Sequence, residues 1–163
     1  MYTIRKAGKS DILKLKDLYD CFVIDMNHYD PTDMSLDADV LSWINNSIDT
    51  KDASIFVAED EGCIIGFIRV QCKERTLDNK EVCHYAKLSD LYVIPEARRT
   101  GVANLLTVTS FKWAKDLMLS EIILNVYERN IAARNLYESI GFINDDNISG
   151  GRIRMKRILL DQY

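Results

Sequence analysis

The segment "LYVIPEARRTGVANLL", at residues 91–106, decides what fold this chain can adopt. An apolar run ends at Pro95, two arginines and Gly101 follow, and an amphipathic run then begins. Proline ends strand pairing, glycine permits a tight turn, and apolar residues spaced three and four apart are typical of a helix. The segment therefore predicts a buried strand that leads into a helix through a short basic loop.

The loop has the features of a phosphate-binding site. A helix N-terminus presents free backbone N–H groups and a partial positive charge, which together attract anions. Arg98 and Arg99 add full charges with fork-shaped donors, and Gly101 lacks the Cβ that would keep a ligand from the backbone. The spacings of a Walker A loop and of the G-x-G-x-x-G fingerprint are absent. The loop predicts a phosphate-bearing ligand, although an ordinary basic turn that caps a helix would have the same composition.

Apolar runs and turn residues predict the other elements. Strands are expected at residues 2–7, in a hairpin at 53–72, and at 81–94, 121–127 and 150–160. Helices are expected at residues 11–26, 36–48, 101–118 and 131–140. Ser10 is predicted to be the N-cap of the first helix, and Gly141 to end the last one.

The order of these elements predicts a single α/β domain over residues 1–163. A strand, helix and strand in succession after residue 81 require a parallel pair joined by a right-handed crossover, whereas the hairpin before them is antiparallel. A chain of 163 residues with 47% hydrophobic content suits one core. We therefore expect a mixed sheet with helices on both faces.

Composition argues against several classes of protein. No apolar run approaches the ~18 residues of a membrane span, and the charged N-terminus lacks the apolar core of a signal peptide, so a cytoplasmic protein is expected. The four cysteines have no C-x-x-C spacing, which favours reduced thiols and no metal site. A net charge of −4 argues against nucleic acid. Ten acidic residues and one lysine between residues 25 and 61 indicate a region that could attract a cation.

The loop and its surroundings resemble one known family. Arg98-x-x-Gly101-x-Ala103 matches the R/Q-x-x-G-x-G/A loop of the GNAT superfamily, the acyl-CoA-dependent N-acetyltransferases. Downstream, "LNVYERNIAARNLYESIGF" resembles the next strand and helix of that family, and "IRKAGKSDILKLKDLY" and "FVAEDEGCIIGFIRV" resemble its first strand, first helix and first hairpin. The resemblance covers nearly the whole chain in order. It implies a mostly antiparallel twisted sheet with one parallel, splayed strand pair and helices on both faces.

The resemblance implies acetyl-CoA as co-substrate, with no metal. The pyrophosphate of coenzyme A is expected over the loop, and the strand before the loop should offer its backbone to the pantetheine arm like an added strand. Asn130 matches an asparagine that contacts the cofactor, and it also suits the N-cap of the helix that follows. The residues expected to bind the cofactor are Leu91, Tyr92, Val93, Arg98, Arg99, Thr100, Gly101, Val102, Ala103, Asn130 and Ala133.

Three residues are candidates for the chemistry. Tyr137 matches the family's general acid, which protonates the leaving thiolate, although its place in an apolar helical stripe is also typical of a core residue. Several family members carry a glutamate just before the aspartate that matches Asp90, and this chain has Ser89 there. The general base is therefore Asp90, Glu128 or a chain of waters, and both acids could instead be structural.

The resemblance implies transfer of an acetyl group to a primary amine by direct attack in a ternary complex. The acidic region favours a small cationic acceptor: a polyamine, an aminoglycoside, a basic amino acid or a lysine-bearing peptide. One alternative is a non-catalytic acyl-CoA-binding module, which the serine at position 89 keeps open, and another is a protein or peptide N-acetyltransferase. Homodimers are frequent in the family, and the sequence leaves the oligomeric state open.

Overall fold

A computed structural model of the chain describes residues 1–32 and 39–159. The described residues form one seven-stranded sheet with the order β1-β2-β3-β4-β5-β7-β6. Its strands are β1 (Thr3–Lys6), β2 (Ala53–Asp60), β3 (Cys63–Thr76), β4 (Val82–Val93), β5 (Glu121–Tyr127), β6 (Ile143–Ile148) and β7 (Arg152–Ile158). The α-helices are α1 (Ile12–Asn27), α2 (Val40–Asp49), α3 (Val102–Asp116) and α4 (Ile131–Ser139). This arrangement confirms the predicted α/β class, with one parallel pair in an otherwise antiparallel sheet.

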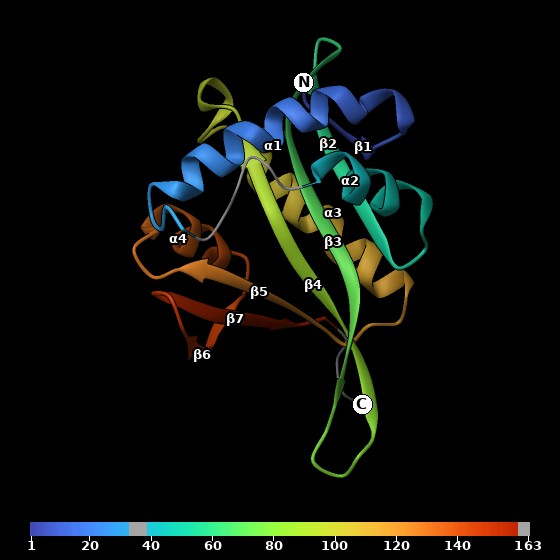
Figure 1. The fold of residues 1–163 in the computed structure, drawn as a ribbon, viewed down its shortest axis with the longest axis vertical. Helices are drawn as coiled ribbons and strands as arrows, with labels where there is room; N and C mark the ends of the chain where they lie inside the picture. Colours follow the sequence, from blue (N-terminus) through green and yellow to red (C-terminus); the bar gives the residue numbers. More distant parts are fainter. Residues whose placement is uncertain (33–38, 160–163) are drawn as a thin grey trace.

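The helices cover both faces of the sheet, as predicted (Figure 1). On one face, Leu15 and Phe22 of α1 and Ile44 of α2 pack in a cluster with residues of β2 and β3. On the other face, Leu106 of α3 and Tyr137 of α4 belong to a larger cluster that includes β4, β5 and β7. Each cluster buries the apolar stripe of its helices, and this burial is the main stabilising contribution to a fold of this kind.

The structure corrects two of the predicted elements. Ser10 is not the N-cap of the first helix: a short 3₁₀ turn (Lys9–Asp11) precedes α1, and Asp11 accepts the Gly8 N–H at 2.8 Å. Strand β6 was not predicted, because its sequence "INDDNI" is polar and mostly exposed and pairs only with β7. The predicted start of the second helix lies outside the described residues, and α2 begins after Asp39, whose side chain accepts the Ser42 N–H.

Strand β4 is paired very differently along its two edges. Towards β3 it is paired from Val82 to Val93, with one β-bulge near Asp90, which has a φ of +52°. Towards β5 it is paired in parallel at only two positions, Ala86 and Lys87. Beyond Lys87 the strands diverge, as Figure 1 shows, so the facing backbone groups have no sheet partner there. This is the splayed parallel pair that the family resemblance implied.

Candidate functional site

A cavity of about 850 Å³ lies at the open edge of β4. Its walls come from the end of α1, the end of β4, the basic loop, the start of α3 and the start of α4. Nine of the residues expected to bind a cofactor line it, namely Leu91, Tyr92, Val93, Arg98, Arg99, Gly101, Ala103, Asn130 and Ala133. Residues that are 42 positions apart in sequence, such as Leu91 and Ala133, therefore share one wall.

The other two expected cofactor residues, Thr100 and Val102, line neither this cavity nor the smaller one described below. Val102 is 1% exposed and packs in the core, and the Thr100 hydroxyl donates to the Ala97 carbonyl at 2.6 Å. The Val102 side chain therefore cannot face a ligand, whereas the Thr100 side chain is exposed and its hydroxyl is bonded within the loop. Gly101 precedes α3 with a φ of +90°, and a Cβ placed on it would meet no atom within 4 Å. The space before the helix N-terminus is thus open.

An ion pair ties α1 to the basic loop. The Arg98 guanidinium donates to the Val93 carbonyl at 2.9 Å and to Asp25 at 2.6 Å. Arg99 is exposed at a φ of +63° and forms no ion pair within the part of the chain that the structure describes. Asp25 was not expected at this site, because its place near the end of a helix gives no sign of contact with a loop 73 residues away.

A smaller cavity of about 350 Å³ continues from the first into the gap between β4 and β5. Phe22, Met26, Leu91, Asn130 and Ala133 line both cavities.

The smaller cavity brings Asp90 and Tyr137 together. Tyr137 is 6% exposed, and burial, followed by the negative charge of Asp90, raises the pKa of its phenol. Burial also raises the pKa of the Asp90 carboxyl, while the positive charge of Arg69, 4.0 Å away, opposes that shift. Both groups therefore favour their protonated forms more than they would in water.

Arg69 is held in place from the opposite side. Its Nε donates to the Ser47 hydroxyl at 2.9 Å, and its guanidinium lies 4.7 Å from the centre of the Trp43 ring. Both partners belong to α2, so this helix positions the counter-charge of Asp90. Glu128, the other acid considered as a base, is exposed and lines neither cavity.

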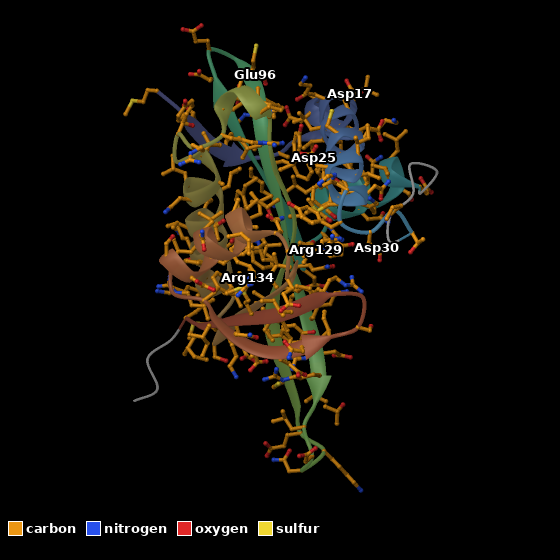
Figure 2. The ribbon with its side chains drawn as sticks, turned by 90° about the vertical axis from the view of Figure 1, so that its left-hand side faces the viewer. Asp17, Asp25, Asp30, Glu96, Arg129 and Arg134 are labelled. Carbon is orange, nitrogen blue, oxygen red and sulfur yellow. The ribbon has the colours of Figure 1, made fainter. Side chains whose placement is uncertain are left out.

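The end of α1 is also tied across the open edge to the β5–α4 connection. Figure 2 views this side of the molecule and labels Asp25 and Arg129. Arg129 donates to the Tyr29 carbonyl at 2.7 Å, and the Tyr29 and Tyr127 rings stack with centres 5.3 Å apart. Asn130 caps α4, as predicted, since its side-chain oxygen accepts the Ala133 N–H at 3.2 Å. The cavities are therefore bordered by α1 on one side and α4 on the other.

The model of the Acetyltransferase (GNAT) family matches residues 15–142, which is most of the chain. This chain belongs to the GNAT family. It is 31% identical over 111 residues to human N-acetyltransferase 8, an alignment that covers 68% of this chain and 47% of that protein. The chain thus spans about half the length of that relative.

Solved structures agree with this fold. The structure of yncA from Salmonella typhimurium with its cofactor acetyl-CoA superimposes with a TM-score of 0.76 and 19% identity, covering all of this chain and 96% of that one. Arabidopsis thaliana NAA60 in complex with acetyl-CoA gives a TM-score of 0.75 at 16% identity, covering 97% and 98% of the two chains. At such identities, the likeness shows that the fold is shared.

Within residues 1–32 and 39–159, no group of three His, Cys, Asp or Glu side chains is placed to hold a metal ion. None of the helices there is long and apolar enough to cross a membrane.

Proposed function

We propose that this chain is an acetyl-CoA-dependent N-acetyltransferase that acts on a primary amine of a small acceptor, and that residues 1–163 form one catalytic domain. The observation that carries the proposal is the continuous path from the basic loop, through the unpaired edge of β4, to Asp90 and Tyr137. A volume of about 850 Å³ is also appropriate for a cofactor, because small-molecule sites typically measure ~300–1,000 Å³.

The larger cavity would hold coenzyme A. The pyrophosphate would lie against the backbone N–H groups at the N-terminus of α3, with Arg99 beside it, because anions bind well where such donors are free. Arg98 can join them once the anion competes with Asp25. The pantetheine arm would follow β4 along residues 91–93, whose edge towards β5 has no ladder partner. Asn130 can contact it through its amide nitrogen, since its oxygen caps α4.

The chemistry would take place in the smaller cavity. The neutral amine attacks the carbonyl carbon of the thioester, a new C–N bond forms, and the C–S bond then breaks. The departing sulfur takes a proton from the Tyr137 hydroxyl, and the excess proton on the newly bonded nitrogen then returns to the Tyr137 oxygen, so that the phenol is restored. Burial raises the pKa of this phenol, so its neutral form is the resting state. Asp90, directly or through a water, accepts the proton that the acceptor ammonium must lose. Glu128 lines neither cavity, so we assign the base to Asp90.

Direct attack is favoured over a covalent acyl-enzyme. None of the four cysteines lines either cavity. A nucleophile within reach of the thioester is required for an acyl-enzyme. The acetyl group would therefore pass straight from coenzyme A to the amine in a ternary complex.

The preference for a cationic acceptor has limited support from the acidic region. Among its described acids, only Asp25 lines either cavity, and Asp25 is already paired with Arg98. Asp33 and Asp37 lie outside the described residues.

The proposal is tested by release of free thiol from acetyl-CoA with a panel of amines, alongside calorimetric titration of coenzyme A. We expect coenzyme A to bind and at least one amine to be acetylated, with the product identified by its mass increase. Tight binding of coenzyme A without turnover of any amine would instead indicate the non-catalytic acyl-CoA-binding module. Turnover of peptides alone would indicate a peptide N-acetyltransferase. The same preparation, examined by sedimentation, tests whether the chain forms a homodimer, as is frequent in the family.

A further inference from the structure

Asp90 lies in a β-bulge of β4. Between the pair Arg69 and Ser89 and the pair Phe67 and Tyr92, one residue of β3 faces two of β4. Asp90 has a φ of +52°, a left-handed value that is uncommon for residues other than glycine. The bulge breaks the alternation of side chains along β4, so the direction of the Asp90 carboxyl depends on the groups around it.

Arg69 on β3 reaches the carboxyl of this bulge. Its Nη1 lies 4.0 Å from Oδ2 of Asp90, and the two side chains are 20% and 18% exposed. Among the residues that the structure describes, no other acid lies within ion-pair distance of this guanidinium. Because both groups are largely removed from water, their attraction is stronger than that of an exposed ion pair. Arg69 is thus placed to favour the ionised form of Asp90.

Helix α2 holds the Arg69 guanidinium in place. The Ser47 hydroxyl, which accepts the Arg69 Nε–H, donates in turn to the Trp43 carbonyl at 2.7 Å, and Ser47 is 1% exposed. The Trp43 ring lies against the guanidinium and packs edge-on against Tyr19 of α1, with ring centres 5.0 Å apart. A planar guanidinium that is held by a hydrogen bond and by an aromatic ring has a fixed orientation.

Other groups that titrate or carry charge surround Asp90. They are Lys87 on β4, Tyr19 on α1 and Tyr137 on α4, together with Tyr127 on β5 and Arg152 on β7, which line the same cavity. Tyrosines are neutral near pH 7. Burial raises the pKa of the Asp90 carboxyl, and the largest opposing contribution comes from Arg69, ahead of Lys87. No other carboxyl among the described residues lines the cavity.

We propose that Arg69 is a positioning residue for acetyl transfer: held by α2, it keeps Asp90 ionised and directed at the smaller cavity. The inference rests on the proposed function, in which Asp90 accepts a proton. A buried carboxyl would otherwise favour its protonated form, which cannot act as a base. Arg69 lines neither cavity, so its effect on the reaction passes through Asp90.

The first test measures the protonation of Asp90 directly. The full chain is labelled with carbon-13 at its aspartate carboxyls, and the resonance of Asp90, identified by its absence from Asp90→Asn, is followed by NMR as the pH changes. Arg69→Gln should raise the titration midpoint by about one pH unit or more, because a neighbouring arginine lowers the pKa of a carboxyl by ~1–3. Arg69→Lys, which retains the charge, should restore most of the parent value.

The second test measures the rate with any amine that is acetylated. On the acidic side of the pH profile, kcat/KM of Arg69→Gln should be lower by about tenfold for each unit by which the midpoint rises, and it should recover at alkaline pH. The Kd for coenzyme A should not change, since Arg69 lines neither cavity. A loss of packing alone would lower the rate at every pH.

Arg75→Gln is the matched control. Arg75 also lies on β3, pairs with Glu121 at 2.5 Å and has its guanidinium 5.6 Å from the centre of the Tyr85 ring. Its register partner is Cys83, seven residues from Asp90 along β4, so Arg75→Gln should leave the Asp90 midpoint and the pH profile unchanged.

Ser47→Ala keeps the test decisive if Arg69→Gln fails to fold. This variant removes the hydrogen bond to the Arg69 Nε and leaves the charge in the protein. Because α2 then holds the guanidinium less firmly, the Asp90 midpoint should rise in the same direction by a smaller amount.

The outcomes separate this inference from the proposed function. An unchanged Asp90 midpoint in Arg69→Gln, or in Ser47→Ala where that variant replaces it, would overturn the inference and leave acetyl transfer intact. A raised midpoint with an unshifted pH profile would also overturn it, because Asp90 would then not be the base. Failure of every amine tested to react, with coenzyme A bound, would overturn the proposed function and this inference with it, whatever the midpoint.

Discussion

The two edges of β4 differ in what they leave for a ligand. Towards β3, nearly every position has a register partner, from the pair Thr76 and Val82 to the pair Gly66 and Val93. Towards β5, only Ala86 and one neighbour are paired. The first edge is an antiparallel ladder interrupted by one bulge, and the second opens into the gap that contains the smaller cavity. One strand thus anchors the sheet on one side and presents free backbone on the other.

A paired edge and an open edge of a strand differ in where their backbone groups find hydrogen-bond partners. A ladder satisfies backbone groups within the protein and tolerates little change in spacing. An open edge leaves N–H and C=O groups that need another partner, and an extended ligand can supply it. Substitutions on the paired edge should therefore change stability, whereas substitutions around the open edge should change binding or rate.

The largest effect is expected at the open edge, for Gly101→Val. A Cβ here would meet no protein atom within 4 Å, so it would occupy the space in front of the N-terminus of α3. We expect the Kd for coenzyme A to rise by about 100-fold, which corresponds to the loss of one or two hydrogen bonds to a charged group. Isothermal titration calorimetry measures this change.

Gly62→Val is the matched control for the strain at position 101. Gly62 also has a positive φ, +81°, with nothing within 4 Å of a built Cβ, but it lies in the β2–β3 turn. Both variants should lose similar stability, and Gly62→Val should bind coenzyme A normally. An unchanged Kd in Gly101→Val would refute the assignment of the loop to the pyrophosphate.

The next effect is expected on the paired edge, for Gly66→Ala. A Cβ at Gly66 would lie 2.7 Å from the Tyr92 carbonyl oxygen, a backbone atom that cannot move without disturbing the ladder. We expect the free energy of unfolding to fall by about 2 kcal/mol, as for an overpacked site. Urea denaturation measures it. Gly8→Ala is the control, since its Cβ would approach no atom closer than 4.0 Å, and equal stability losses in both variants would contradict the argument.

A smaller effect is expected for Tyr137→Phe. The ring would keep its contact with Phe142, whose centre lies 5.5 Å away, while the proton donor is lost. We expect kcat to fall at least about tenfold with little change in the Kd for coenzyme A. Steady-state kinetics and titration give the two values. Tyr85→Phe, on the part of β4 that is paired with β3, should have normal kcat, and a normal kcat in Tyr137→Phe would remove it as the acid.

The smallest effect concerns Asp90, at the bulge where the open edge begins. Burial raises its pKa in the folded protein, against the charges of Arg69 and Lys87 and the hydroxyl of Ser89. The folded state then binds more protons than the unfolded state above pH ~4, so Asp90 makes stability decline as pH rises. The stability of Asp90→Asn relative to the parent should therefore be greater at pH 7 than at pH 4. Denaturation at both pH values measures this difference. The opposite trend would mean that Arg69 dominates.

Local chemistry made much of the architecture predictable. The elements on either side of the basic loop could be predicted from apolar runs, glycine turns and the helix ends at Asn130 and Gly141. Each of these signals depends only on the nearest few residues. Strand β6 escaped prediction because its exposed polar residues lack the alternation of a half-buried strand. Ser10 was a reasonable cap by residue type, but Arg5 on β1 holds Asp11 in place, and that is a contact between two elements.

The sequence by itself determined the class of the fold and the loop at residues 98–103, since the residues that define them are neighbours in the chain. Only the tertiary structure decided how far β4 and β5 diverge, that Asp25 pairs with Arg98, and that Lys87 and Arg152 share a cavity with Asp90. Each of these depends on residues far apart in sequence and on the packing of α1, α2 and α4 around the open edge. No local sequence pattern predicts such distances, because they depend on how all the elements pack together in the core.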